Sequence, residues 1–170
     1  KSDAPLVKES LGKLSSESRR NRFFSAVREF SDETVHRLTH FDTATEFAVV
    51  VVRPEKGKEI PLAGGRFVHC DDGQRCEFSL LIGDPWQGQR IGHRILRTLI
   101  REAVRRGLRQ MEGHVLADNR AMLKLARAHG FMIDDNSEEA GVKLVTLDLP
   151  SPQPRVWPRL FRKLLKFGRK

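Results

Sequence analysis

The residues best suited to chemistry lie in one segment, EFSLLIGDPWQGQRIGHRILRTLI, which covers residues 77–100. Its pattern predicts a strand, then a turn rich in glycine and glutamine, and then a long helix. The first turn of a helix has unpaired backbone N–H groups and the positive end of the helix dipole, so it attracts phosphate. Gly88 and Gly92 would let a phosphate approach that backbone closely. The segment therefore predicts a phosphate-binding loop.

A second interpretation of these glycines stays open, namely a tight turn followed by a glycine that serves packing alone. The loop is not a P-loop, because no Gly-Lys-Ser/Thr follows it, and its spacing differs from the dinucleotide-binding G-x-G-x-x-G. His93 comes directly after the loop and either contacts the ligand or lies on the helix surface.

The elements around this segment predict an α/β fold in the order ααβββαβαββ, with one mixed sheet packed by helices. Phe23, Phe24, Val27 and Phe30 form one stripe of a helix over 14–30, and a second, short helix begins at SDET (31–34), with Ser31 as its N-cap. The strand candidates are residues 46–52, 62–70, 76–82, 110–116, 131–133 and 142–149. The two remaining helices are expected from Ile91 to Gly107 and from a cap at Asp118 to Gly130, and Asp72-Gly73 predicts a hairpin turn.

Three segments in this order resemble the GNAT superfamily of acyl-CoA-dependent N-acetyltransferases. QGQRIG at 87–92 is similar to the superfamily's Q/R-x-x-G-x-G/A loop, and VLADNRAMLKLARAHGF at 115–131 is similar to its strand-turn-helix that ends in Gly-Phe. Residues 14–51 resemble the acetyltransferase domain of bacterial Pat-type protein lysine acetyltransferases, which share an L-S-x-E-S-R…R-F-F opening. The resemblance covers residues 3–149.

The resemblance implies a GNAT fold, with a mixed, mostly antiparallel sheet flanked by helices and with the usual first strand missing. It implies acetyl-CoA as co-substrate and no metal. The pantetheine arm would pair with the strand at Leu80 and Ile82, and Asn119 would face the cofactor. Backbone amides would hold the pyrophosphate at Gln87, Gly88, Gln89, Arg90, Ile91, Gly92 and His93.

The resemblance also assigns the family's general base to Glu77. The chemistry is reasonable, because a lysine with a pKa near 10.4 is almost wholly protonated at neutral pH and needs a base. Alternation along the strand puts Glu77, Ser79 and Leu81 on one face, where Glu77 can border a cleft. The alternative is a solvated glutamate at the start of a hairpin strand.

Two positions depart from the family pattern. Arg90 stands where the loop prefers glycine, and a left-handed backbone there would cost about 1–2 kcal/mol. A right-handed backbone would instead add a cation beside the phosphates. Ala126 stands where most GNAT enzymes have a tyrosine that protonates the leaving thiolate, and the chain has no tyrosine. The general acid is therefore unassigned, and solvent is the expected donor.

The net charge of +9 over 170 residues is concentrated at the C-terminal end. Residues 155–170 hold seven of the nine net charges, which leaves +2 for the rest. We expect a domain over 1–149, a proline-rich linker over 150–158 and a basic amphipathic helix over 159–170. That helix folds back on its own domain, contacts an acidic partner or lies on an anionic membrane. Nucleic acid is not expected, since the body lacks a basic face.

The remaining composition predicts a cytoplasmic protein, with neither a secretory signal nor a membrane-spanning run. His69, Cys70 and Cys76 lie close together across the expected hairpin, where a metal or a redox pair is conceivable. Three ligands on a short turn make a poor zinc site, so reduced thiols are expected.

The sequence thus predicts an N-acetyltransferase that moves an acetyl group from acetyl-CoA to an amine, a protein lysine, by direct attack in a ternary complex. Two alternatives stay open at this point. One is acetylation of a small-molecule amine, and the other is a non-catalytic module that senses acyl-CoA.

Overall fold

The computed structural model describes residues 4–24, 30–40, 42–134 and 140–151. Three helices come first, where two were expected: α1 (Ala4–Gly12), α2 (Ser16–Phe23) and α3 (Asp32–Thr39). The other helices are the short 3₁₀ helix η1 (Asp84–Trp86), α4 (Ile91–Arg105) and α5 (Arg120–Ala128). The strands are β1 (Glu46–Glu55), β2 (Lys58–His69), β3 (Arg75–Ile82), β4 (Gln110–Leu116), β5 (Met132–Asp134) and β6 (Val142–Asp148).

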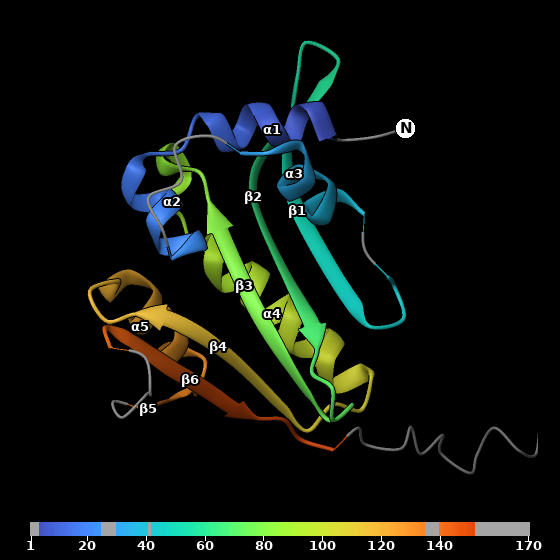
Figure 1. Ribbon diagram of the computed structural model, residues 1–170, viewed down its shortest axis with the longest axis vertical. Helices are drawn as coiled ribbons and strands as arrows, with labels where there is room; N and C mark the ends of the chain where they lie inside the picture. Colours follow the sequence, from blue (N-terminus) through green and yellow to red (C-terminus); the bar gives the residue numbers. More distant parts are fainter. Residues whose placement is uncertain (1–3, 25–29, 41, 135–139, 152–170) are drawn as a thin grey trace, which may run out of the picture.

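The six described strands form one sheet in the order β1-β2-β3-β4-β6-β5 (Figure 1). All neighbours are antiparallel except β3 and β4, which are parallel. In the described part of the chain β1 is an edge strand and no strand precedes it. The α/β class and the mixed, mostly antiparallel sheet are confirmed.

Helices cover both faces of the sheet, and adjacent residues of β3 show this directly. Leu80 packs against the main core, to which α4 and α5 contribute, whereas Leu81 packs against a smaller cluster with α1 and α3. The two faces differ because side chains alternate along a strand. The fully buried side chains of α4 are Ile95, Leu96, Leu99 and Ala103.

Two local predictions were wrong. The helix expected over 14–30 ends at Phe23, because Phe24 takes a left-handed conformation (φ 57°) and its N–H bonds to Arg20 O. Val27 lies outside the described residues, while the Phe23 and Phe30 rings still meet at 5.0 Å. The cap of α5 is Asn119, not Asp118: its side chain accepts from Met122 N at 3.0 Å.

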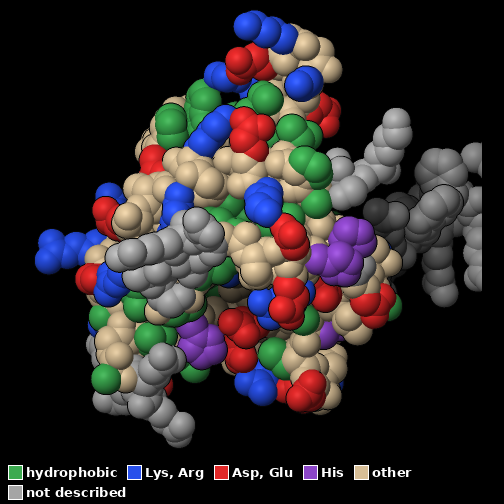
Figure 2. Space-filling view, turned by 45° about the horizontal axis from the view of Figure 1, so that its top comes forward, with side chains coloured by type: hydrophobic (Ala, Val, Ile, Leu, Met, Phe, Trp, Pro, Cys, Tyr) green, Lys and Arg blue, Asp and Glu red, His purple; other side chains and the backbone are tan. Residues whose placement is uncertain are grey.

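Most of the proline-rich linker and all of the basic C-terminal segment lie outside the described residues. On the face drawn in Figure 2, Lys and Arg side chains are interspersed with Asp and Glu rather than gathered in one field. None of the described helices has the length and apolar character needed to cross a membrane.

Candidate active site

The site begins where β3 and β4 separate. Their parallel pairing runs only from Arg75–Gln110 to Glu77–Glu112, although β3 continues to Ile82. On its other edge β3 stays paired with β2 as far as Ile82. The edge of β3 that faces β4 is therefore unpaired beyond Glu77, inside the sheet rather than at its margin.

The backbone direction shows which residues of β3 face this gap. Gly83 N donates to Leu62 O, so the backbone N–H of Gly83 points toward β2. Backbone groups alternate from edge to edge along an antiparallel strand. The backbone N–H and C=O groups of Leu80 and Ile82 therefore point into the gap. One of them, Ile82 O, accepts a hydrogen bond from Gln87 Nε2 at 3.3 Å. An extended chain could pair with this edge as an added strand.

A cleft of about 470 Å³ fills the gap and continues to the start of α4. It borders every predicted site residue except Gln89, whose amide donates to Pro85 O at 3.1 Å. Those on its walls are Glu77, Leu80, Ile82, Gln87, Gly88, Arg90, Ile91, Gly92, His93 and Asn119.

The start of α4 has no capping side chain among the described residues. Its first N–H groups therefore keep their hydrogen-bonding capacity at the mouth of the cleft. Gly88 (φ 74°) turns the chain into the helix with open space around it. Gly92 has a different role, since a Cβ there would lie 3.1 Å from both Ile82 Cδ1 and Leu125 Cδ2. One glycine thus serves the turn and the other close packing.

The family departure at Arg90 is resolved by its backbone, which is left-handed (φ 61°, ψ 11°). The conformation is the one in which a side chain is strained. The other departure, Ala126, is fully buried in the core and does not border the cleft.

The sequence did not reveal what anchors α2 over the cleft. Asp84 accepts hydrogen bonds from Ser15 N (2.8 Å), Ser15 Oγ (2.7 Å) and Ser18 Oγ (2.7 Å). Burial acts to raise the pKa of Asp84, but these hydrogen bonds outweigh it and the pKa is lowered. Gln87 Nε2 also donates to Ser18 Oγ at 3.1 Å. Ser15 and Ser18 of the LSSES motif thus tie α2 to the segment that connects β3 to α4.

At its other end α2 is tied to the start of α5. Arg20 Nη1 lies 2.8 Å from Asp118 Oδ2, so the residue expected to cap α5 forms an ion pair instead. Asn119 caps the helix and borders the cleft at the same time.

Glu77 borders the cleft with a half-exposed side chain, and its Oε1 lies 3.4 Å from His114 Nδ1 on β4. The contact joins the two strands close to where their pairing ends. His114 had no role in the sequence analysis, because only the parallel register of β3 and β4 brings it near Glu77.

A histidine pair lies beside the loop. His93 Nδ1 is 3.1 Å from His129 Nε2, which links α4 to the C-terminal end of α5. The pKa of His129 is lowered by burial, then by the charges of His93 and Arg97.

The two cysteines are free thiols. Burial raises the pKa of Cys76 to about 12 and also raises that of Cys70, so neither is activated as a thiolate. No group of three or more potential ligands for a metal occurs in the described part of the chain.

The cleft thus offers two things that an acyl-CoA needs. The uncapped start of α4 suits a pyrophosphate, and the free edge of β3 suits the amides of a pantetheine arm. Seen from α4, Glu77 lies beyond Leu80 along β3. An acyl group at the end of the pantetheine arm would therefore come close to Glu77.

Comparison with known proteins agrees with this geometry. The Acetyltransferase (GNAT) family matches residues 14–131. An acetyltransferase of Pseudomonas aeruginosa is 31% identical over 130 residues, which is 76% of this chain and 70% of that protein. Acetyltransferase Pat of Mycolicibacterium smegmatis is also 31% identical over 130 residues, but these are only 38% of its length.

Among solved structures, the GNAT domain of S. lividans PAT superimposes with a TM-score of 0.77 at 26% identity, covering 86% of this chain and 85% of that one. The family match spans more than half of the chain, and its relatives are acetyltransferases. The chain therefore belongs to the GNAT family, as an N-acetyltransferase domain of the acetyl-CoA-dependent kind.

Proposed function

We propose that this chain transfers an acetyl group from acetyl-CoA to the amine of a protein lysine by direct attack in a ternary complex. The observation that carries the proposal is the position of Glu77, which borders the same cleft as the free edge of β3 and the uncapped start of α4. The resemblance of residues 14–51 to Pat-type protein lysine acetyltransferases supports a lysine as acceptor.

We assign binding of the cofactor to the backbone. The N–H groups of residues 88–93 would hold the pyrophosphate, the edge of β3 at Leu80 and Ile82 would pair with the pantetheine amides, and Asn119 would face the cofactor. Acetyl-CoA supplies the acyl group as an activated thioester. These residues orient it with the thioester toward Glu77.

Glu77 acts as the general base through one water, because an amine must lose a proton before it can attack. The amine nitrogen then bonds to the thioester carbonyl carbon, the C–S bond breaks, and solvent protonates the thiolate. We assign stabilisation of the carbonyl oxygen, which gains charge during the attack, to the backbone N–H of Leu80. No side chain of the chain is needed as the general acid.

The test is release of free thiol from acetyl-CoA with lysine-containing peptides and with small primary amines. Glu77→Gln is expected to lower kcat by about 10²–10⁴-fold while acetyl-CoA still binds. The matched control is Glu59→Gln, an exposed glutamate of β2. An undiminished rate in Glu77→Gln would contradict the role of this residue. Turnover of small amines alone would contradict lysine as acceptor, and cofactor binding without any turnover would indicate a sensing module.

A further inference from the structure

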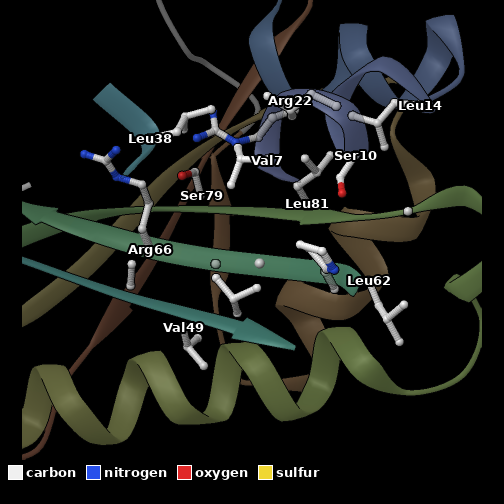
Figure 3. Close-up of a pocket in the computed structure, with 18 of the residues that line it drawn as sticks. Val7, Ser10, Leu14, Arg22, Leu38, Val49, Leu62, Arg66, Ser79 and Leu81 are labelled. Carbon is white, nitrogen blue, oxygen red and sulfur yellow. The ribbon is translucent and has the colours of Figure 1, made fainter. Parts of the chain in front are cut away.

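A second cavity lies on the opposite side of β3 from α4, under the helical layer. It has a volume of about 160 Å³ and lies between α1 and strands β1 to β3 (Figure 3). Its walls are mainly apolar, with Val7, Leu11, Leu14, Leu38, Leu62 and Leu81 among them. A dry cavity of about 150 Å³ holds a benzene molecule, so this one has room for a short hydrocarbon chain.

The cavity adjoins the cleft, because Arg22, Ser79 and Leu81 border both. Ser79 precedes Leu80, the residue to which we assign the end of the pantetheine arm and the thioester. A donor acyl group longer than acetyl would therefore extend past Ser79 toward the cavity. In Figure 3, Arg22 extends from the helical layer toward the sheet at this point.

Arg22 forms no ion pair within the part of the chain that the structure describes. Burial and, to a lesser extent, the charge of Arg66 lower the pKa of Arg22 to about 10, and the charge of Glu77 only partly opposes them. Its guanidinium carbon lies over the Phe23 ring, 5.0 Å from the ring centroid. A half-buried charge of this kind gains much from an anionic partner.

Arg66, the other cation of the cavity, is different. It forms an ion pair with Glu46 on β1 and donates to Arg37 O at 3.0 Å. Glu77, which acts electrostatically on Arg22 and would repel an anion, has its Oε1 3.4 Å from His114 Nδ1. An anion at this junction would therefore pair with Arg22.

We infer that the cavity and Arg22 together accept the acyl chain of a dicarboxylic acyl-CoA of the succinyl kind, with its methylenes against the apolar wall and its terminal carboxylate on Arg22. This inference rests on the proposed function, since it needs the thioester beside Leu80. It extends the donor from acetyl-CoA to a longer, carboxylated acyl group. The bonds that form and break in the transfer are the same as for acetyl.

The test is calorimetric titration of the full chain with acetyl-CoA, butyryl-CoA and succinyl-CoA. Butyryl and succinyl have the same chain length, so their comparison isolates the carboxylate. We expect succinyl-CoA to bind at least about tenfold more tightly than butyryl-CoA, as one buried charge-assisted contact provides. Arg22→Met keeps an apolar side chain without the charge, and it should bring the ratio of the two dissociation constants close to one.

The matched control is Arg101→Met on the exposed face of α4, which should keep the wild-type ratio. Equal affinity of the wild-type chain for succinyl-CoA and butyryl-CoA would overturn the inference, and so would an unchanged ratio in Arg22→Met. Failure of the cofactor site on which both proposals rest is a separate result, because then acetyl-CoA itself would not bind.

Discussion

Helices α4 and α5 both begin at the cleft, but their first turns differ. At α5, Asn119 accepts a hydrogen bond from Met122 N, so one free N–H group is already satisfied within the chain. At α4, Arg90 is left-handed and supplies no capping bond. A cap is usually worth about 1 kcal/mol, so its omission from the longer helix has a stability cost.

The chain therefore keeps hydrogen-bonding capacity for a ligand at the start of α4 and not at the start of α5. The same contrast separates the two edges of β3, one paired with β2 to Ile82 and the other free beyond Glu77. The free edge and the uncapped helix meet at one cleft, where they would bind a long, polar, multiply charged ligand through the backbone.

The largest expected effect is a loss of ligand affinity when a bulkier side chain displaces the start of α4. Gly92→Val would press its side chain on Ile82 and Leu125, which already lie 3.1 Å from the position of a Cβ. Overpacking of this kind costs about 1–3 kcal/mol and moves the helix. We expect at least an about tenfold loss of acetyl-CoA affinity by calorimetry.

Gly12→Val is the matched control, because that glycine has open space around it. If Gly92→Val bound acetyl-CoA as tightly as the wild type, the start of α4 would not be the binding site.

Removal of the anchor between α2 and the loop should come next in size. Asp84→Ala leaves three donor groups of Ser15 and Ser18 without their acceptor. Since hydrogen bonds to charged groups are worth about 1.5–3 kcal/mol and are not additive, we expect a loss of about 2 kcal/mol in the free energy of unfolding by urea denaturation. Asp118→Ala, which breaks an exposed ion pair, should cost less than about 1 kcal/mol. Equal losses would show that Asp84 is no special anchor.

Removal of the cap of α5 would leave both α4 and α5 without a capping side chain. Asn119→Ala should lower the free energy of unfolding by about 1 kcal/mol, the usual value of an N-cap. Urea denaturation measures the loss, with Asn21→Ala as a control from the wall of the same cleft. An unchanged midpoint would mean that the Met122 hydrogen bond is not formed in solution.

The smallest effect should be a gain at α4. Arg90→Gly removes the side chain from a left-handed position, which we expect to stabilise the fold by about 0.5–1 kcal/mol. A rise in the thermal midpoint would confirm the strained backbone. A fall would show that the Arg90 side chain stabilises the loop more than its backbone strains it.

Much of the fold could be predicted from local patterns. The helix expected from Ile91, the Asp72-Gly73 turn and the alternation of β3 are all short-range signals, and the structure confirms them. The motif at 87–92 also predicted the position of the loop before α4. Its glycines and the helix that follows them lie within one short segment of the sequence.

The missed features depend on contacts between distant segments. Asp84 and Ser15 are 69 residues apart, and nothing in either local sequence pairs them. The point where β3 and β4 stop pairing could not be predicted from the side chains of β3. Side chains project from the faces of a sheet, whereas pairing depends on the backbone groups at its edges. His114 near Glu77 follows from that register, and the end of α2 at Phe24 overrides a helical pattern that continued to residue 30.

The central claim is that the free edge of β3 and the uncapped start of α4 together bind acetyl-CoA. Calorimetric titration with acetyl-CoA and with acetyl-pantetheine, which lacks the pyrophosphate, tests it most directly. We predict one site per chain for acetyl-CoA and binding of acetyl-pantetheine that is weaker by at least about 100-fold, because the charged contacts at α4 are lost. Equal affinity for the two compounds, or no binding of acetyl-CoA by the folded chain, would contradict it.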